Sequence, residues 1–390
     1  MEKLLVAALA IGLFGLLTST IYMGMVLFAV ARFLRAARVA SSTAYTPPAS
    51  LLKPLHGAEP GLDKHLATFF EQDYPNFEIL FCARHLDDAG LAVARSVAAR
   101  YPDVPVQFLA SGEPTAPNAK ILSLERMALA ARHDILIVSD SDVQVQRDYI
   151  REVAAPFAQE SVGAVTCLYR GVAAEGGLWS RIEAAAMSVE MSAGVLVADM
   201  LQGMDFALGP TMAVRRSCLE EIGGFLPMAD YCSDDFLLGN WVAGRGHIVV
   251  LSHHTIDHIV LHDSFLASMR HQARWMKSTR FSRPKGHFGT VLTFSVPFGV
   301  LAALAAFAMH RPVLAACLLL GSIATRMAMA MAVSQKVLRE KSMWQSVLLY
   351  PARDLLAICF WLASYGSRKI LWRNEVYVLE KEGRMRCAKM

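Results

Sequence analysis

The stretch from Leu4 to Ala31 contains no charged residue, and this constrains the chain more than any other feature. An α-helix rises about 1.5 Å per residue, so the stretch is long enough to cross a hydrocarbon core of roughly 30 Å. The apolar residues continue through Leu27 without a small-residue cleavage site, which favours an uncleaved anchor over a secretory signal peptide. We therefore expect a transmembrane anchor within residues 1–33.

Two further observations place the segment after this anchor in the cytoplasm. Arg32, Arg35 and Arg38 follow it with no acid nearby, and such an excess of basic residues marks the cytoplasmic flank of a membrane helix. The seven cysteines include no CxxC pair, which argues against a disulfide framework or a zinc site and fits a reducing compartment. We expect an integral membrane protein with a cytoplasmic domain.

The composition becomes lipid-like again near the C-terminus. Thr290–Met309 and Val313–Val333 are apolar and lie on either side of three turn-forming or charged residues, so they predict a transmembrane hairpin. Arg326 interrupts the second stretch, and a charge in mid-membrane costs about 2.5 to 3.5 kcal/mol on insertion scales, so we expect it to face a partner or a cavity. The chain is also 54% hydrophobic, which is high for a soluble enzyme of 390 residues.

A third apolar stretch, Ser346–Gly366, contains Pro351, Arg353 and Asp354. If it spanned the membrane, the basic tail at 367–390 would lie outside, against the positive-inside tendency. A re-entrant or interfacial segment is more consistent with the charges, and a third membrane helix is the alternative. We assign residues 284–366 to a C-terminal membrane region.

Between the membrane segments, after a linker at 34–50, residues 51–283 have the pattern of an α/β domain. The expected strands (77–82, 104–109, 135–138 and 162–168) alternate with expected helices (90–100 and 121–132). Such alternation favours a parallel sheet covered by helices, with ligands at the carboxyl ends of the strands. No GxGxxG follows the first strand, so the fingerprint of a dinucleotide-binding fold is missing.

Acidic residues follow two of these expected elements. Asp87 and Asp88 come after the strand at 77–82 and could also be solvated loop acids. Asp140 and Asp142 follow the strand at 135–138 in the octet VSDSDVQV, where two carboxylates two residues apart on an extended segment would point the same way and could hold a metal. The alternative is a solvated turn, since Asp is a common turn former.

Two more clusters come later in the domain. Asp234 and Asp235 follow Ser233 at the start of an expected helix, where Ser and Asp are also common N-caps. The segment RHQARW ends in Arg274 and Trp275, which offer a bidentate cation and a flat apolar face, suited to a diphosphate and to a sugar or lipid acceptor. Its alternative is a basic and aromatic belt beside the membrane.

Together the four clusters have the order that transfer from a nucleotide-sugar requires. A diphosphate leaving group develops negative charge, which a divalent cation held by Asp140 and Asp142 and a contact from Arg274 would stabilise. The acceptor hydroxyl loses its proton as it attacks, and Asp235 could act as general base. Four histidines (His253, His254, His258 and His262) lack the HExxH spacing and alternate like a strand, which disfavours a zinc site.

The chain resembles the ceramide glucosyltransferases and the related bacterial hopanoid-associated glycosyltransferases, glycosyltransferase family 21. The resemblance rests on segments spread over most of the chain: LLKPLHGAEPGL (51–62), FFEQDYPNFEIL (69–80), RYPDV (100–104), PNAK (117–120), SDSDVQV, GPTMAVRR (209–216), IGGF (222–225), SDDF, ARW and LWRNEVYVL (371–379). It implies an α/β catalytic domain with the GT-A fold, which is Rossmann-like with a mostly parallel sheet, and a location in a bacterial inner membrane.

Carried over by position, the resemblance implies a role for each motif residue. Asp235 is the catalytic base, and Asp140, with Asp142, holds a Mg²⁺ or Mn²⁺ ion at the diphosphate. The implied nucleotide-sugar contacts are Lys53, Asp88, Lys120, Asp140, Arg274 and Trp275, with Asp87, Asp234 and His271 as additional candidates. His271 departs from the family pattern, which has Gln or Arg at the first position of (Q/R)xxRW, and its charge would depend on pH. Ala89 and Gly90 depart too, where Pro-Ala is usual.

These observations favour an inverting transfer of a hexose from a UDP-sugar to a primary hydroxyl of a membrane lipid. We expect glucose as the sugar and ceramide as the lipid. The alternative within enzymes is transfer of N-acetylglucosamine to a hopanoid polyol. A processive polysaccharide synthase would need more membrane helices than the three or four expected here, and a non-catalytic sensor would not need its acids. The sequence indicates neither a nucleic-acid partner nor an oligomeric state.

Overall fold

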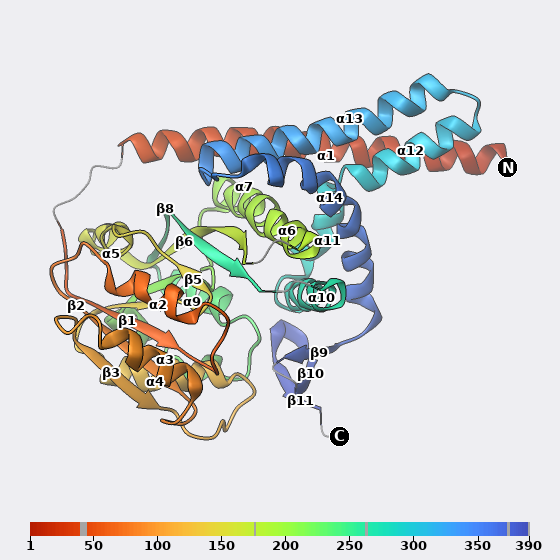
Figure 1. Cartoon of the computed structure of the whole chain (residues 1–390). Helices are drawn as coiled ribbons and strands as arrows, with labels where there is room; N and C mark the ends of the chain where they lie inside the picture. The colour runs from red at the N-terminus through yellow and green to blue at the C-terminus, as the bar shows by residue number, and fades with distance from the viewer. Residues whose placement is uncertain (40–44, 175–176, 262–263, 373–374, 389–390) are drawn as a thin grey trace. The chain divides into compact units, whose positions relative to one another are not determined.

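The computed structural model describes residues 1–390 apart from 40–44, 175–176, 262–263, 373–374 and 389–390. The chain forms two compact units, which are described separately below (Figure 1). Unit 1 consists of Met1–Arg38, Gly171–Leu201 and Val260–Glu382, and unit 2 of Val39–Arg170, Gln202–Ile259 and Gly383–Met390. Part of the expected linker at 34–50, His262 and two basic residues of the C-terminal segments, Arg373 and Lys389, lie outside the described residues.

Unit 2 is built around an eight-stranded sheet of order β3-β2-β1-β4-β7-β6-β8-β5. Its strands are β1 (Ala49–Pro54), β2 (Phe77–Ala83), β3 (Val106–Ala110), β4 (Ile135–Val138), β5 (Val143–Gln144), β6 (Val162–Ala173), β7 (Met212–Arg215) and β8 (Ile248–Val260). The four strands from β3 to β4 are parallel, whereas β7 runs antiparallel to both β4 and β6, and β5 antiparallel to β8. The expected mostly parallel sheet is therefore confirmed over its first half.

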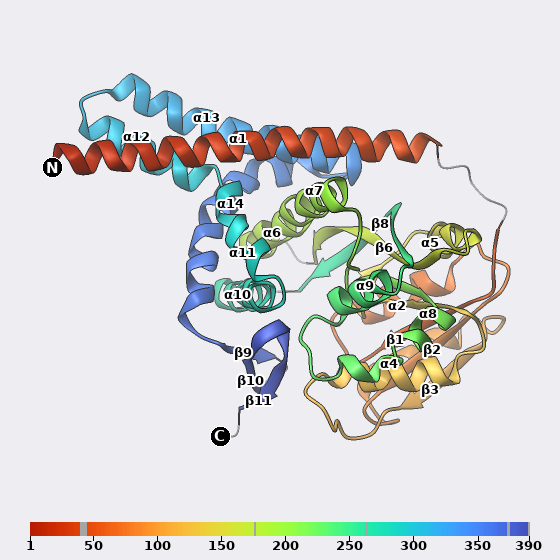
Figure 2. The ribbon, with the colours of Figure 1, turned by 180° about the vertical axis from the view of Figure 1, so that it is seen from behind.

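Helices cover both faces of this sheet (Figure 2). They are α2 (Leu62–Phe70), α3 (Ala89–Ala98), α4 (Ala119–Ala130), α5 (Tyr149–Ala154), α8 (Arg216–Glu221) and α9 (Asp234–Gly244), with short helical turns at Ala155–Ala158 and Leu226–Met228. Alternate residues of a strand face opposite sides. Leu52 and Leu80 accordingly pack with buried residues of α4, α8 and α9, while Phe81 lies on the other side and stacks on Phe70 of α2.

The predicted strands and helices of this domain are confirmed in kind, with shifts of a few residues at their ends. The strand order brings the ends of β1 and β4 together, because these two strands pair in parallel from Ala49 opposite Ile135 to Leu52 opposite Val138. Lys53 and Asp140 therefore leave neighbouring strand ends. This is the edge of the sheet where a parallel arrangement places ligands.

Unit 1 is mainly helical. It contains α1 (Glu2–Val39), α6 (Leu178–Ala185), a π-helical turn (Ala186–Met191), α7 (Ser192–Gln202), α10 (Phe265–Ser282), α11 (Pro284–Thr290), a 3-10 turn (Val291–Thr293), α12 (Val296–Ala308), α13 (Pro312–Met331), a second π-helical turn (Ala332–Val337) and α14 (Met343–Gly366). A hairpin of β9 (Lys369–Trp372) and β10 (Glu375–Leu379) follows, and β11 (Met385–Cys387) belongs to unit 2.

Close packing joins α1 to α12. A methyl group on Gly12 would lie 2.7 Å from the Ala302 side chain, and one on Gly15 would overlap the ring of Phe298. Small residues allow helix backbones to approach in this way, which is a common basis of helix association in membranes. The N-terminal helix and the helices near the C-terminus therefore belong to one packed body.

Within the described residues, four helices are long and apolar enough to cross a membrane: Glu2–Ala37, Leu178–Gln202, Pro312–Val337 and Met343–Gly366. The number is five if α11 to α12 counts as one bent span. The predicted N-terminal anchor and the second arm of the hairpin are among the four. These helices, together with the sheet domain, fit a membrane protein.

The structure bears on three sequence-based expectations for unit 1. The stretch Thr290–Met309 is not one helix, because the chain breaks at Phe294–Ser295 and bends by 47°. Ser346–Gly366 belongs to the continuous helix α14, which contains Pro351 and has the length of a span. The α/β domain expected at 51–283 includes Leu178–Gln202, yet this helical segment packs within unit 1.

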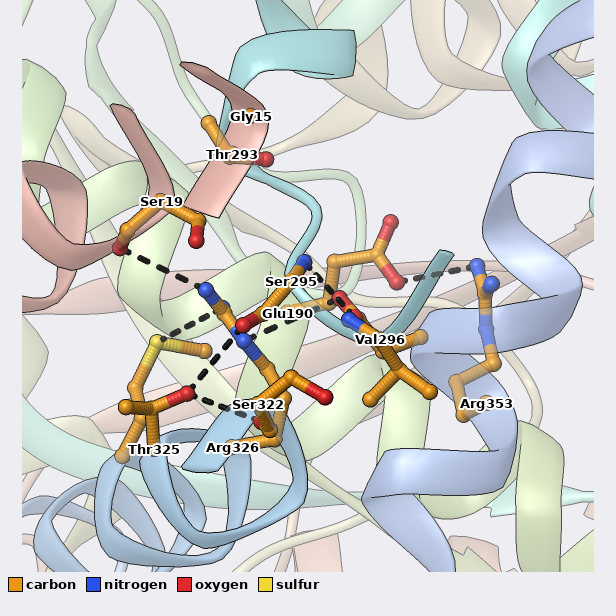
Figure 3. Close-up of polar contacts among 12 residues, drawn as sticks. Gly15, Ser19, Glu190, Thr293, Ser295, Val296, Ser322, Thr325, Arg326 and Arg353 are labelled. Atoms are coloured by element: carbon orange, nitrogen blue, oxygen red, sulfur yellow. Dashed lines mark hydrogen bonds and ion pairs between the residues drawn. The ribbon is translucent and has the colours of Figure 1, made fainter. Parts of the chain in front are cut away.

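A buried polar cluster holds the helices of unit 1 together (Figure 3). The Arg326 side chain is 1% exposed, its Nε lies 3.9 Å from Asp354 Oδ1, and its Nη2 donates to the carbonyl oxygen of Ser19 at 3.5 Å. Asp354 Oδ2 accepts hydrogen bonds from the backbone N–H groups of Ser295 and Val296 at 2.9 and 2.7 Å. The expectation that Arg326 faces a partner is confirmed.

Asp354 therefore does two things at once. It neutralises Arg326, and it binds two of the N–H groups that have no partner inside α12, at the point where the apolar stretch is broken. A second ion pair lies nearby, between Arg353 Nη2 and Glu190 Oε2 at 2.9 Å (Figure 3). Charges on α13, α14 and the 186–191 turn are thus matched inside one unit, and α1 contributes the carbonyl oxygen of Ser19.

Replacing Asp354 by Ala should lower the free energy of unfolding by roughly 3 kcal/mol, because it leaves Arg326 buried without a counter-charge and the start of α12 without its acceptor. Asp354→Asn should lose less, since an amide oxygen can still accept from the two N–H groups. Thermal unfolding of the purified protein in nanodiscs would measure both. Leu355→Ala, which shortens a 41% exposed side chain on the same helix, is the control. Equal losses for Asp354→Ala and Leu355→Ala would contradict the prediction.

Candidate active site

The acids predicted from the sequence meet a buried lysine at the carboxyl end of β4. Lys120, in the first turn of α4, lies with its Nζ 2.8 Å from Asp140 Oδ1 and 3.4 Å from Asp234 Oδ2. Its side chain is only 12% exposed. Burial lowers the pKa of Lys120, but the carboxylates of Asp140 and Asp234 outweigh burial and raise it above the ordinary lysine value. Lys120 is therefore a permanent cation between two acids.

Asp235 lies beside this cluster at the start of α9. Its Oδ2 accepts the N–H of Gly209 at 2.9 Å. A methyl group built on Gly209 would lie 3.3 Å from Asp235 Oδ2 and 3.7 Å from Asp140 Oδ2, so both carboxylates reach the same glycine. Burial and the adjacent Asp234 carboxylate raise the pKa of Asp235 to about 6, although Lys120 and backbone N–H groups act in the opposite direction.

Lys53 contacts the backbone of this site at Asp140. It is fully buried, its ammonium donates to the backbone oxygen of Asp140 at 2.5 Å, and it lies 3.6 Å from the centre of the Phe69 ring. Burial lowers its pKa to about 7, against the pull of Asp140 and Asp142. A side chain without exposure is suited to fixing the turn after β4, which favours a positioning role over direct contact with a nucleotide-sugar.

Asp142 points to a different partner from Asp140. The chain leaves the strand after Val138, and the two acids lie in the turn before β5, so the premise of an extended segment was wrong. Asp142 Oδ2 lies 3.2 Å from His258 Nε2 on β8. Burial raises the pKa of Asp142, but the His258 side chain outweighs burial and the value falls to about 2.

The fit of a divalent cation can be judged from these oxygens. Asp142 Oδ1 is buried and makes no hydrogen bond within the described part of the chain. Across those same residues, no group of three or more His, Cys, Asp or Glu side chains is arranged to hold a metal by itself. Mg²⁺ and similar ions often bind to one or two carboxylates and complete their shell with water and substrate phosphates. Asp142 Oδ1 is an oxygen that could bind such an ion, whereas Asp140 Oδ1 lies 2.8 Å from Lys120, so a two-carboxylate site at Asp140 and Asp142 stays a prediction.

Asp88 has a structural contact of its own. It is the N-cap of α3, accepting from Gly90 N at 2.7 Å, and its two oxygens also accept from Gly57 N at 3.0 and 3.1 Å. The loop that carries Gly57 reaches the acidic turn, because Glu59 Oε2 accepts from the Ser141 hydroxyl at 2.8 Å. Asp88 thus anchors the loop beside the acids, whereas Asp87 is exposed.

The basic and aromatic residues of RHQARW lie on α10 in unit 1. His271, Arg274 and Trp275 occupy positions i, i+3 and i+4, which share one side of a helix. The rings of His271 and Trp275 are 4.7 Å apart, and the Arg274 guanidinium lies 5.7 Å from the centre of the Trp372 ring. These residues and the acids belong to different units, so their convergence stays a prediction.

Comparisons with known proteins identify the family of the chain. The model of the family described as Glycosyl transferase family 21 matches residues 12–385. The chain belongs to glycosyltransferase family 21. The resemblance inferred from the sequence is thereby confirmed.

Curated members of this family are similar over part of the chain. Ceramide glucosyltransferase 1 of Caenorhabditis elegans is 26% identical over 236 residues, which is 59% of this chain and 49% of that protein. The match therefore spans about half the length of that relative. A ceramide glucosyltransferase of Komagataella phaffii is 35% identical over 100 residues, 25% of this chain and 20% of the relative.

A solved structure supports the fold. A mannosyltransferase of Pyrobaculum calidifontis, in complex with GDP-Man and Mn²⁺, superposes with a TM-score of 0.53 at 17% identity. The superposition covers 91% of this chain and 98% of the other. At this identity the likeness shows the fold alone, and the GT-A fold predicted for this family-21 chain is confirmed.

Three residues that contact predicted site residues were not singled out from the sequence. Gly209 stood in a quoted segment, but nothing in the sequence indicated that two carboxylates flank it. His258 was noted only for its place in an alternating strand, and its contact with Asp142 depends on the pairing of β5 with β8. Glu183, which contacts His271, is 88 positions away along the chain, and no sequence signal joins the two.

Lys120→Met should lower the free energy of unfolding by roughly 3 kcal/mol, because it removes the cation shared by Asp140 and Asp234 and leaves these acids to repel each other. Thermal unfolding at neutral pH would measure the loss. Lys64→Met replaces an exposed lysine of α2 in the same unit and is the control. A loss no greater than that of Lys64→Met would show that the buried lysine contributes nothing to stability.

Proposed function

We propose that this protein is an inverting glycosyltransferase that moves a hexose from a UDP-sugar to a primary hydroxyl of a membrane lipid and forms a β-glycoside. Glucose is the proposed sugar and ceramide the proposed acceptor. The observation that carries the proposal is the meeting of Asp140, Asp234 and Asp235 around Lys120 and Gly209, at the ligand-binding edge of the sheet in a family-21 chain. The names of the similar proteins from Caenorhabditis elegans and Komagataella phaffii support the choice of acceptor.

Asp235 is the proposed catalytic base. The acceptor oxygen would form a bond to the anomeric carbon while the bond from that carbon to the diphosphate breaks, and the electron pair would leave with UDP. The hydroxyl proton would pass to the Asp235 carboxylate. A base works best when its pKa lies near the operating pH, and a value of about 6 meets this condition better than that of an ordinary aspartate.

The other site residues would hold the donor. Lys120 and Asp140 would lie at the diphosphate, and Arg274 would bind it in a bidentate manner, with Trp275 against the sugar or lipid. Asp140 and Asp142 would hold a Mg²⁺ or Mn²⁺ ion, which when bound stabilises negative charge on the leaving group. Asp88 and Lys53 would act by positioning, through the loop at Gly57 and the turn at Asp140.

The membrane arrangement follows from the same proposal. Arg32 and Arg35 at the end of the N-terminal helix favour a cytoplasmic sheet domain, in a bacterial inner membrane. The donor is soluble and the acceptor remains in the bilayer. In the sequence, apolar helices precede and follow the catalytic segments. An enzyme built in this way can bring the two substrates together.

A screen of UDP-sugars against lipid acceptors tests the function. UDP-glucose and UDP-N-acetylglucosamine would be supplied with ceramide or a hopanoid polyol and Mn²⁺ or Mg²⁺, and the lipid products identified by mass spectrometry. Glucosylceramide is expected. A glycosylated hopanoid would replace the proposed acceptor, and no UDP release with any pair would refute the enzyme assignment.

Asp235→Asn should reduce the rate of transfer by roughly 100- to 10,000-fold, because an amide cannot take up the hydroxyl proton. Binding of UDP-sugar should persist, since Asp235 is not assigned to the donor. Asp134→Asn, at an aspartate whose side chain is 86% exposed at the other end of β4, is the control. Transfer retained by Asp235→Asn would remove this residue from the role of base.

The rate of transfer should fall as the pH drops through about 6, because Asp235 is then protonated and cannot act as a base. Asp234→Asn should shift this fall to lower pH, since the Asp234 carboxylate is one of the groups that raise the pKa of Asp235. Profiles of transfer rate against pH for the wild-type protein and for Asp234→Asn, from about pH 4.5 to about pH 8, would measure the shift. An unchanged midpoint would contradict the assignment.

A further inference from the structure

The C-terminal segment Gly383–Cys387 lies along the loop Asp230–Cys232, and both belong to unit 2. Cys232 N donates to the carbonyl oxygen of Gly383 at 3.0 Å, and Met385 N donates to the carbonyl oxygen of Asp230 at 2.6 Å. These two bonds flank an antiparallel bridge between the loop and the segment. We call the segment the C-terminal strap, because its backbone binds the loop that directly precedes the acids of α9.

A side-chain contact joins the same two parts of the chain. Arg384 Nε donates to the Tyr231 hydroxyl at 2.9 Å, and the guanidinium carbon lies 5.3 Å from the centre of the Tyr231 ring. Tyr231 is buried, and its ring also packs edge-on against the ring of Trp241 at a centre-to-centre distance of 6.2 Å. Trp241 belongs to α9, the helix that begins with Asp234 and Asp235. Tyr231 thus connects the strap to the helix of the proposed base.

The loop is also bonded to the start of α4, two residues before Lys120. Asn118 N donates to the carbonyl oxygen of Ala229 at 2.9 Å, and Asn118 Nδ2 donates to that of Tyr231 at 3.0 Å. The same amide nitrogen lies 3.4 Å from Asp234 Oδ1. Asn118 is fully buried, so water does not compete for these contacts. The loop therefore has bonds both to the strap and to the buried residues of the acid cluster.

Backbone geometry shows that the strap begins at a defined turn. Glu382 has a φ of 62° and Gly383 a φ of 82°, and both values lie in the left-handed region. A non-glycine residue in this region costs roughly 1 to 2 kcal/mol, so the contacts that follow have to compensate for Glu382. Glycine adopts the region readily, and Gly383 supplies the carbonyl oxygen that binds the loop.

The position of the loop should depend on the strap more than the stability of the fold does. A neutral hydrogen bond contributes about 0.5 to 1.5 kcal/mol, and backbone groups that are released at a surface can bond to water instead. Loss of the strap should therefore leave unit 2 folded. A shift of about 1 Å in a reacting group can cost roughly 100-fold in rate, so movement of the loop would affect turnover first.

We propose that the C-terminal strap is a positioning element of the active site, which holds the loop Asp230–Cys232 and thereby keeps Asp235 in its catalytic orientation. Arg384 is the positioning residue of the strap, and it acts through Tyr231. The proposal rests on the proposed function, because it concerns the base of that reaction.

Steady-state kinetics of the full-length protein in nanodiscs test the role of Arg384. Arg384→Ala should lower the kcat of transfer by about tenfold and leave the KM for UDP-sugar nearly unchanged, because Asp235 is not assigned to the donor. Arg384→Lys keeps a cation that can donate a hydrogen bond and should recover most of the rate. Lys381→Ala, which removes an exposed positive charge close by in the sequence, is the control. An equal loss of kcat in Lys381→Ala would contradict the assignment.

A double-mutant cycle tests whether Arg384 acts through Tyr231. Tyr231→Phe removes the oxygen that accepts from Arg384 Nε, so Arg384→Ala should lower kcat less in this background than in the wild-type protein. Fully additive losses would show that Arg384 does not act through the Tyr231 hydroxyl.

Removal of residues 383–390 separates positioning from folding. The truncated protein should unfold at nearly the same temperature as the full-length protein, yet transfer sugar more slowly than Arg384→Ala does. Hydrogen exchange of the backbone amides should become faster at 229–236 and remain unchanged at 212–221, which covers β7 and α8. An unchanged kcat would overturn the proposal. Faster exchange at both places would overturn it too, because the effect would then be structural.

Hydrogen exchange also keeps this test independent of catalysis. If the wild-type protein transferred no sugar to any lipid, the proposed function would fail. The exchange rates at 229–236 would still decide whether the strap holds the loop, and rates that did not differ between the full-length and truncated proteins would refute it.

Discussion

The repulsion among the acids at the end of β4 is the constraint on which the site depends, and Lys120 resolves it. Asp140 lies after β4 and Asp234 and Asp235 lie at the start of α9, and without the cation between them their carboxylates would repel one another. Because Lys120 reaches only Asp140 and Asp234 directly, the three acids are left unequal. Asp235 holds its proton more tightly than an ordinary aspartate, and this difference distinguishes the proposed base from its neighbours.

The same principle operates in unit 1, where each buried charge is matched by a residue distant in sequence. Asp354 pairs with Arg326, Glu190 with Arg353 and Glu183 with His271. Such pairs contribute little net stability compared with apolar packing, but they are costly to break, so they favour one arrangement of the helices over others. The π-helical turn at Ala186–Met191 lies between Glu183 and Ser192 and carries Glu190.

The pattern of neighbouring residues was sufficient to predict most helices and strands. Contacts between residues far apart in the sequence could not be predicted. Ile135–Val138 could be identified as a buried strand and Asp235 as a helix-start acid, because both depend on neighbouring residues. The separation of Asp140 from Asp142 could not, since it depends on His258 in a strand that pairs with β5. Likewise, Leu178–Gln202 was expected to belong to the domain at 51–283, whereas in the fold the partners of Glu183 and Glu190 come from α10 and α14.

The make-up of unit 1 from three separate segments has a consequence for the biogenesis of the protein. Gly12 and Gly15 of α1 pack against α12, so this part of α1 meets α12 only after nearly three hundred further residues have been made. During that interval the charged helix at Leu178–Gln202 has neither α10 nor α14 to match its acids. The membrane body therefore closes late in synthesis, while most of the sheet domain can assemble earlier from residues that are already available.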